Sequence, residues 1–312
     1  MRINRIAGLR AMAACAMFGT TAPWLAWNDP LGAQQSPVIT VQGLQRIKSD
    51  PNLVILHIGP KEDYDAGHIE GARFVTMQDL AVDDSVQKLS LEMPSEADLR
   101  ARLQRLGIGN KSKVVVTFGA DWGSPSTRTM WALQVAGVGP QSQLLDGGTV
   151  AWKRAGLPLT KAVPAPAVAG VLTVPAHREL TVDYAWMQSH VNSPGVKLID
   201  GRAPVFFEGA GMKMDGRPPS PAGHIAGAKN IPFNSLVTDD VLLLPIDSLR
   251  KTFANAGVQP GDTVAAYCHI GQQGTTVLLV ARLLGHPVRL YDGSMNDWNN
   301  RKLPMVNDRP GN

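Results

Sequence analysis

The chain has 312 residues, a formal net charge of +4 and two cysteines. This length is sufficient for two domains of ordinary size. Lysine and arginine form no continuous basic stretch after the first residues, so the positive charge gives no reason to expect a nucleic-acid-binding protein. We interpret the basic excess as a slightly cationic surface.

Residues 1–33 predict a secretory signal peptide. Three arginines, Arg2, Arg5 and Arg10, precede an apolar stretch, and residues 31–33 suit a cleavage site. The apolar stretch is short for a membrane span, so we expect no stable membrane anchor. The prediction is export, to the periplasm in a bacterium. The alternative is a disordered N-terminal tail on a cytoplasmic protein.

The rest of the chain contains one pattern twice. Residues 66–72 (AGHIEGA) recur as residues 222–228 (AGHIAGA), and the Asp-to-Trp spacing of residues 146–152 recurs in residues 292–298. A repeat of this kind predicts one structural unit used twice. We therefore expect an N-terminal domain at 37–160, a Pro/Ala-rich linker at 161–178 and a C-terminal domain at 179–306.

Each half predicts the same order of elements: strand, turn, short strand, helix, strand, loop, helix, strand. The first half opens with the apolar run 53–56 and the second with 196–199. Short, nearly continuous apolar strands that alternate with helical patterns indicate an α/β fold. The expected sheet is mostly parallel and covered by helices on both faces.

A histidine recurs in the repeated turn, as His68 and His224. We expect both rings to bind backbone groups and hold the turn. Cysteines, histidines and carboxylates do not cluster at metal-ligand spacing, so we predict no metal site, and the sequence indicates no cofactor.

Cys268 is the residue most indicative of chemistry. It follows the apolar strand 263–267 and precedes a polar loop, 269–274, and a helix that begins at Thr275. Free backbone N–H groups and the positive end of a helix both stabilise an ionised thiolate. Gln272 and Gln273 are poor core neighbours, so we expect the sulfur to face a polar opening. Cys15 would leave with the signal peptide, which makes an intramolecular disulfide impossible.

An alignment of the two halves places Phe118 where the second half has Cys268, and Gly59 where it has Arg202. The thiol and the cation are absent from the first half together, which suggests that they serve one site. Arg202 follows a predicted strand, where open α/β sheets bind ligands, and its planar fork suits an anion. The alternative for Arg202 is a surface ion pair of little energetic value.

The second half also carries an insertion, roughly residues 204–221, which contains Arg217. This segment is expected either to overhang the site and supply a second cation, Arg217, or to form a mobile surface loop.

These motifs together resemble those of the tandem-domain rhodanese family of sulfurtransferases. In the second half the matching pieces are residues 198–202, residues 223–228, the Cys268 loop, and residues 290–294 with Trp298. The resemblance covers nearly all of the chain after residue 33. It implies two small α/β domains, of which the N-terminal copy lacks the cysteine.

The resemblance also implies a two-step sulfur transfer. Cys268 would take a sulfur atom from a small donor, keep it as a persulfide, and pass it to cyanide or a thiol. Substrate groups would be bound by Arg202, by Arg217 and by the loop residues His269, Ile270, Gly271, Gln272, Gln273 and Gly274.

The loop departs from both common family patterns. Members that use thiosulfate often place basic residues directly after the cysteine, whereas this chain has His269 and Ile270. Members that use 3-mercaptopyruvate typically have a serine at the place of Ile270. We favour thiosulfate, with a partly protonated His269 assisting an anionic donor. The alternatives are 3-mercaptopyruvate, or a sulfur carrier without turnover. A phosphatase on a related fold would need an arginine where Gly274 and Thr275 stand.

Overall fold

The computed structural model describes residues 35–119, 123–209 and 223–307. The expected signal peptide and Arg217 therefore lie outside the described residues. All elements below belong to the compact unit that begins at Gln35.

The first half contains a five-stranded parallel sheet in the order β1-β7-β6-β2-β3, and a separate antiparallel hairpin, β4–β5. Short 3₁₀ helices occupy Met77–Asp79 and Gly139–Gln141. The longer elements are β1 (Val38–Ile39), α1 (Val41–Ile47), β2 (Leu53–Ile58), α2 (Lys61–Ala66), β3 (Ala72–Val75), β4 (Val82–Asp84), β5 (Leu89–Glu92), α3 (Glu96–Arg105), β6 (Lys113–Phe118), α4 (Ser124–Val135), β7 (Ser142–Leu145) and α5 (Gly148–Arg154).

The second half repeats this arrangement. Its parallel sheet has the order β8-β12-β11-β9-β10 when read from the equivalent edge. Short 3₁₀ helices occupy Arg178–Leu180 and Phe233–Leu236. The longer elements are β8 (Thr181–Val182), α6 (Tyr184–His190), β9 (Val196–Asp200), α7 (Pro204–Phe207), β10 (Lys229–Asn230), α8 (Ile246–Asn255), β11 (Thr263–Tyr267), α9 (Gly274–Leu283), β12 (Val288–Tyr291) and α10 (Ser294–Asn300). The predicted α/β fold and the internal repeat are confirmed.

The strands predicted at 53–56 and 196–199 are present as β2 and β9, but the prediction that they open their halves was wrong. In each half a two-residue edge strand and a helix come before this strand, and the edge strand pairs with the last strand of its sheet, β1 with β7 and β8 with β12. Two residues are too few to produce the alternation that marks a strand in a sequence. The predicted order also omitted the short helices α1, α2 and α5 of the first half, α6, α7 and α10 of the second, and the β4–β5 hairpin.

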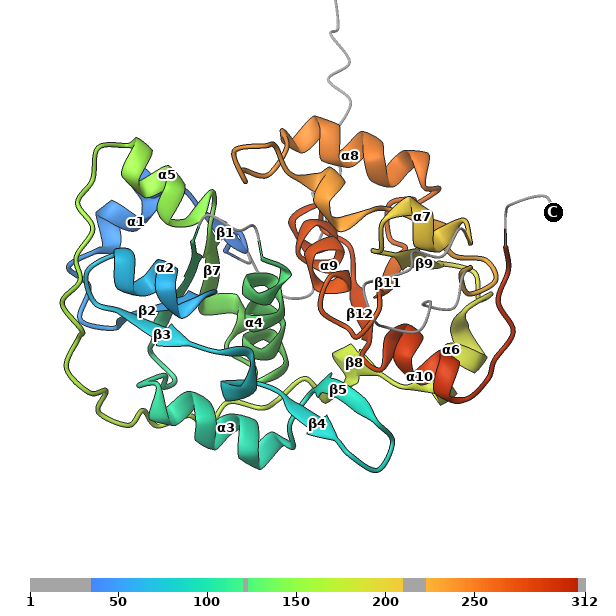
Figure 1. Cartoon of the computed structure of the whole chain (residues 1–312), viewed down its shortest axis with the longest axis horizontal. Coiled ribbons are helices and arrows are strands. Elements are labelled where there is room, and N and C mark those ends of the chain that lie inside the picture. The colour runs from blue at the N-terminus through green and yellow to red at the C-terminus, as the bar shows by residue number, and fades with distance from the viewer. Residues whose placement is uncertain (1–34, 120–122, 210–222, 308–312) are drawn as a thin grey trace, which may run out of the picture. The chain divides into compact units, whose positions relative to one another are not determined.

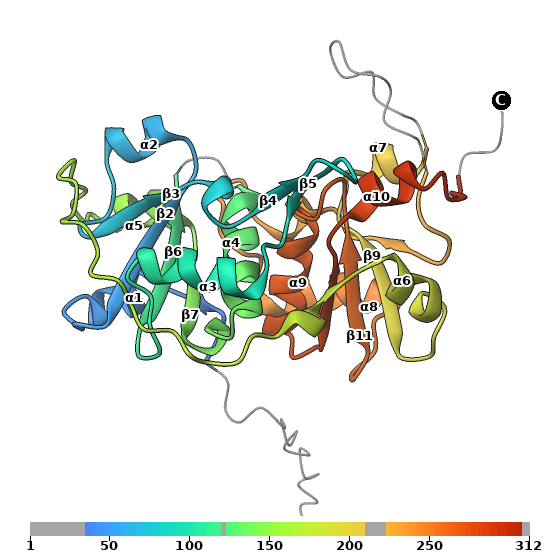
Figure 2. The same cartoon turned by 90° about the horizontal axis from the view of Figure 1, so that it is seen from below.

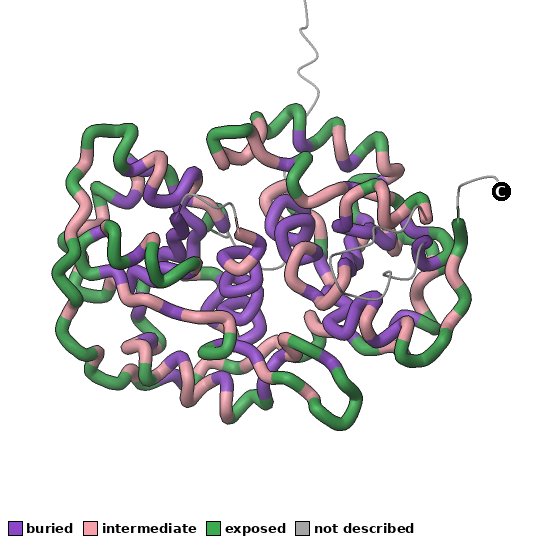
Figure 3. Tube along the Cα trace, viewed as in Figure 1, coloured by how far each residue is buried: buried purple, intermediate pink, exposed green. Residues whose placement is uncertain are grey.

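The strands alternate their side chains between two layers of core. In β2, Val54, Leu56 and Ile58 pack toward α3 and α4, whereas Ile55 packs toward α1 and α5. The second half is built likewise, with α8 and α9 over one face of its sheet and α6 and α10 over the other. This arrangement explains why the central strands are buried on both faces (Figure 3).

Helices α4 and α9 lie side by side (Figures 1 and 2). Because both are buried along most of their length, the core layers that contain them merge into one cluster of buried side chains. The first half thus packs against the helix that directly follows the Cys268 loop.

The expected linker does not hang free of the first half. Its backbone is bound there through Gly170 N–H, which donates to Gln104 O, and His177 N–H, which donates to Val135 O. Thr173 also exchanges two hydrogen bonds with Asn110.

The two repeated histidines hold their turns, as expected. The Nδ1 atom of His68 lies 2.8 Å from Tyr64 O, and that of His224 lies 2.9 Å from Phe207 O. Each histidine also forms an isolated β-bridge, to Thr160 and Val306 respectively. Among the described residues, no helix has both the length and the apolar character needed to cross a bilayer.

Candidate functional site

The strand registers confirm the comparison of the two halves. Leu53 of β2 pairs with Lys113 of β6, and Val196 of β9 pairs with Thr263 of β11. Phe118 lies five residues after Lys113, and Cys268 lies five residues after Thr263, so the two residues occupy equivalent positions. Gly59 lies six residues after Leu53, and Arg202 lies six residues after Val196, so these two are equivalent as well.

The backbone of Cys268 is held by the segment that follows β12. Its N–H donates to Ser294 Oγ at 3.1 Å, and its carbonyl accepts from Met295 N–H at 3.1 Å. Both contacts come from the first two residues of α10, which follows β12 closely, so this helix start positions the cysteine.

The expectation that the sulfur faces a polar opening was wrong. Cys268 has 0% exposure, while His269 and Ile270 beside it are half-buried. The polar loop that follows Cys268 in the sequence gave no sign of this burial. A donor therefore reaches Sγ only after neighbouring groups move.

The loop after Cys268 offers a row of free donors. Within the described residues, none of the backbone N–H groups of residues 269–273 donates to a protein acceptor. The loop leads into α9, a helix of 10 residues whose first turn has no side-chain cap. Free N–H groups at a helix start bind and stabilise negative charge. This loop can therefore hold a thiolate or an anion bound to it.

Arg202 is not a freely exposed cation. Its side chain has 0% exposure and forms an ion pair with Asp200, in which Nη2 lies 2.6 Å from Oδ2 and Nε lies 3.0 Å from Oδ1. Nη2 also donates to Gly223 O at 2.7 Å. Among the described residues, Nη1 has no hydrogen-bond partner although it is buried. One N–H edge of the guanidinium thus remains available to an oxygen ligand.

His269 does not supply positive charge. Its burial, together with the nearby Arg202 guanidinium, lowers its pKa from 6.5 to about 4. Its ring packs edge-on against Phe206, with the ring centroids 4.6 Å apart. The expected partial protonation of His269 was therefore wrong, since a buried imidazole beside a cation stays neutral at neutral pH.

The loop borders a cavity of about 660 Å³, into which Gln272 projects. Gln272 Nε2 donates to Ser124 Oγ at 2.8 Å, which joins the loop to the start of α4. The other lining residues come mainly from the first half, at the carboxyl ends of β2 and β3 and at the start of α4: Ile58, Gly59, Pro60, Lys61, Phe74, Val75, Thr76, Met77, Gln78, Gly123, Ser124, Pro125 and Ser126, with Phe233 from the second half.

The structure thus brings Cys268, its loop and Arg202 together. Burial alone would lower the pKa of Arg202, but its hydrogen bonds and ion pair with Asp200, and more weakly the nearby Tyr267 and Cys268, raise it. Sequence reasoning missed two supporting residues, Asp200 and Ser294. Both lie inside the motifs quoted above, so their place in the repeat was the available signal.

Comparison with known proteins identifies the family. A model of the rhodanese-like domain matches twice, at residues 40–155 and 183–301. The chain belongs to the rhodanese family. Two matches in tandem agree with the two sheets of equal strand order.

The most similar relatives of this rhodanese include sulfurtransferases with two different named donors. The thiosulfate sulfurtransferase of Rattus norvegicus is 30% identical over 246 residues, which are 78% of this chain and 81% of that protein. A Pseudomonas aeruginosa protein named "Probable 3-mercaptopyruvate sulfurtransferase" is 32% identical over 275 residues, 84% of this chain and 94% of that protein.

Solved structures agree in fold. The crystal structure of YnjE matches with a TM-score of 0.77 at 22% identity, over 88% of this chain and 69% of that one. Wild-type EanB matches with a TM-score of 0.77 at 20% identity, over 89% of this chain and 70% of that one. At this identity both matches support the fold alone.

Proposed function

We propose that this rhodanese is a sulfurtransferase that carries the transferred sulfur on Cys268. The observation that carries the proposal is the row of unpaired backbone N–H groups between Cys268 and α9. Such a row stabilises the thiolate before the transfer and the charged outer sulfur after it.

The proposed reaction has two steps. In the first, the Cys268 thiolate attacks the outer sulfur of thiosulfate, the S–S bond of the donor breaks, and sulfite leaves with the electron pair. In the second, cyanide or a thiolate attacks the outer sulfur of the persulfide. The persulfide bond breaks, the product carries the sulfur away, and the Cys268 thiolate returns.

The proposed roles of the other residues follow from their contacts. The buried Nη1 of Arg202 would bind an oxygen of the donor, and Asp200 would hold the guanidinium in place. The N–H groups of the loop from His269 to Gly274 would bind the sulfur. We keep the domain bounds of 37–160 and 179–306 as part of this proposal.

Thiosulfate is kept as the first candidate donor because the Rattus norvegicus relative is named a thiosulfate sulfurtransferase, and 3-mercaptopyruvate is the second candidate. The neutral His269 and the Asp200 charge beside Arg202 reduce the positive charge available to a dianion, which favours the second candidate. The name of the similar P. aeruginosa protein also supports 3-mercaptopyruvate as the donor. A carrier without turnover would form the persulfide with either donor but would not cycle.

Intact-mass measurement tests the proposal. After incubation with thiosulfate, or separately with 3-mercaptopyruvate, the wild-type chain is expected to gain one sulfur atom, and the Cys268→Ser variant none. Addition of cyanide should remove the sulfur and yield thiocyanate over repeated cycles. A Cys268→Ser variant that still turns over would refute the mechanism, and loading without turnover would indicate a carrier.

We also propose that the protein is exported, with residues 1–33 removed as a signal peptide. N-terminal sequencing of the protein from its native host is expected to give a mature chain that starts at Gln34. A mature chain that starts at Met1 would refute export by this route.

A further inference from the structure

The strongest observation outside the cysteine motif is a buried arginine in the half that lacks the cysteine. Arg128 lies in α4 with 2% exposure. Its Nη1 donates to Asp292 Oδ1 at 2.5 Å and to Gly271 O at 3.2 Å, and its Nη2 donates to Leu91 O. Two of these three acceptors belong to the second half, and one of them lies in the Cys268 loop.

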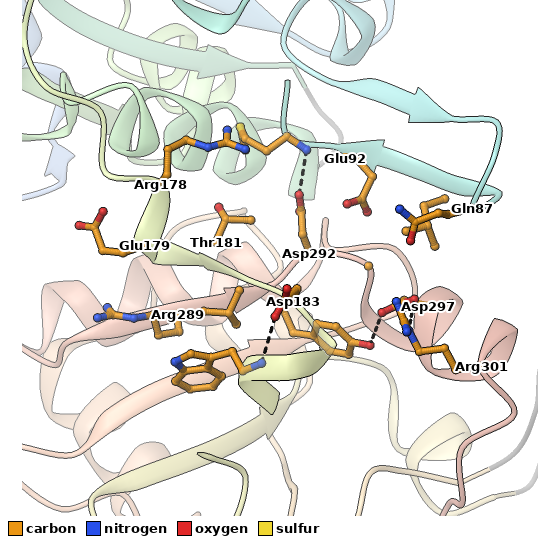
Figure 4. A pocket seen from close by; sticks show the side chains of 16 residues that line it. Gln87, Glu92, Arg178, Glu179, Thr181, Asp183, Arg289, Asp292, Asp297 and Arg301 are labelled. Carbon is orange, nitrogen blue, oxygen red and sulfur yellow. Dashed lines mark hydrogen bonds and ion pairs between the residues drawn. The ribbon is translucent and has the colours of Figure 1, made fainter. Parts of the chain in front are cut away.

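One of these acceptors, Asp292, is bound by a second group of the first half. Besides the Arg128 contact at Oδ1, its Oδ2 accepts from Met93 N–H at 2.8 Å (Figure 4). Met93 directly follows β5, so the β4–β5 hairpin contacts the segment after β12. Both contacts are buried, since Asp292 has 4% exposure.

The segment that begins at Asp292 supports the cysteine. Ser294 and Met295 bind the backbone of Cys268, and Asn296 N–H donates to His269 O at 3.0 Å. The hairpin also contacts this segment through Asn296 Nδ2, which donates to Lys88 O at 3.0 Å. Arg128 and the hairpin therefore bind the same support on which Cys268 rests.

The bond from Arg128 to Gly271 O has a direct consequence for the loop. In a planar trans peptide, the carbonyl and the following N–H point to opposite sides. Anchoring the Gly271 carbonyl on Arg128 therefore directs the Gln272 N–H away from Arg128. Gln272 N–H is one of the donors that has no acceptor among the described residues.

Gly271 allows this close approach. Its φ is +76°, and a Cβ atom there would lie 2.5 Å from Asp292 O and 3.3 Å from Arg128 Nη1. A side chain at this position would separate the loop from both anchors.

Stability alone does not explain a charged pair at this place. A buried ion pair is often replaced by apolar residues without loss of stability, because desolvation of both charges offsets their attraction. A guanidinium fork with three acceptors in two halves instead fixes one geometry. The residue before Arg128 also joins the two halves, since Thr127 Oγ1 lies 2.8 Å from Thr275 Oγ1 at the start of α9.

We propose that Arg128 is a positioning residue for the sulfur-transfer site, so that the half without the cysteine completes the loop that holds the transferred sulfur. Arg128 acts through Asp292 and the Gly271 carbonyl and does not touch the sulfur donor. The effect on sulfur transfer rests on the proposed function, whereas the effect of Arg128 on the conformation of the loop does not depend on it.

The test uses Arg128→Lys, which keeps the charge but cannot reach all three acceptors with a planar fork. The measured quantities are the rate of sulfur loading onto Cys268 and the amide hydrogen exchange of residues 269–273. The expected result is a loading rate at least about tenfold lower, because small misplacements of reacting groups cost this much or more. Exchange of the loop amides should accelerate, while that of α8 stays unchanged.

Arg100→Lys is the matched control. Arg100 is also an arginine of the first half that binds a distant carbonyl, Leu172 O at 3.0 Å, but it lies on α3. It should load sulfur at the wild-type rate. Asp292→Asn should behave like Arg128→Lys, and the double variant should load no more slowly than the slower single variant, since both act through one contact.

A loading rate within about twofold of wild type, with unchanged loop exchange in Arg128→Lys, would overturn the proposal. If this variant does not fold, unchanged loop exchange in Asp292→Asn would overturn it instead. A wild-type protein that takes up no sulfur would refute the proposed function, whereas loop exchange would still decide the positioning role.

Discussion

Arg202 and Asp200 form a buried pair in which neither charge has an exposed surface. Removal of one partner leaves the other buried and unpaired, which typically costs about 3–5 kcal/mol of folding free energy. Loss of activity in an Arg202 variant is therefore ambiguous unless stability is measured with it.

We expect Arg202→Ala to lower the free energy of unfolding by about 3–5 kcal/mol in urea denaturation. Arg202→Lys should lose less, since a charge still faces Asp200. The control is Arg250→Ala, which removes an exposed pair with Asp247 and should cost less than about 1 kcal/mol. An Arg202→Ala variant as stable as this control would mean that Asp200 does not depend on Arg202.

Comparison of the two halves predicted much of the site at the scale of single residues. The register confirms Phe118 and Gly59 as the counterparts of Cys268 and Arg202, and it places His57 where Asp200 stands. The sequence could not predict that Asp200 holds Arg202, because a carboxylate two residues before an arginine is common on surfaces. The lowered pKa of His269 depends on burial and on Arg202, a residue distant in sequence, which the local pattern does not reveal.

Among the elements, those with a strong local pattern were predictable. Long apolar strands such as β6 and β11 are visible in the sequence, and so are the amphipathic helices α3 and α8. The sequence of helix α4 does not reveal that this helix contacts the Cys268 loop. Nearly all of its residues are buried, so its pattern does not distinguish Arg128 from core positions.

The role of the β4–β5 hairpin could not be predicted from the sequence either. It is short, and it joins neither central sheet. Its contacts are mainly backbone carbonyls and N–H groups: Lys88 O, Leu91 O and the N–H of Met93. Backbone contacts leave no mark in the residue types, so only the folded chain reveals that this hairpin supports the cysteine segment.

At the scale of the whole molecule, several buried or half-buried groups make stability depend on pH, and two histidines and one glutamate have the large shifts; burial also raises the pKa of Asp146, with the same sign as that of Glu92. Burial lowers the pKa of His57 to about 4 and that of His269 to about 4, while burial and the Asp292 charge raise the pKa of Glu92 to about 8. Because the inner core layers of both halves form one cluster, we expect these effects to act on a single unfolding transition.

The sign of each effect follows from the protons bound in each state. Between about pH 4 and 6.5, the unfolded chain binds protons at His57 and His269 that the folded chain does not, so stability falls as the pH falls through this range. Between about pH 4.5 and 8, the folded chain keeps a proton on Glu92 that the unfolded chain releases, so this group makes stability fall as the pH rises. Below pH 6.5 the stabilising effect of rising pH at the two histidines exceeds the destabilising effect at Glu92, so stability increases with pH. Above pH 6.5, of these three groups only Glu92 changes its protonation, so stability decreases.

We therefore expect the free energy of unfolding to reach its maximum near pH 6.5, measured by urea denaturation from about pH 4.5 to 8.5. His57→Phe should reduce the acid slope by about 1.4 kcal/mol per pH unit, the effect of one proton. Glu92→Gln should flatten the alkaline side and leave the acid side at least as steep. Glu92 also lies in the first half, but part of its raised pKa comes from Asp292 of the second half, so a Glu92 effect within one shared transition would also indicate that the halves unfold together. Two separate transitions, each sensitive to one variant, would contradict the common core.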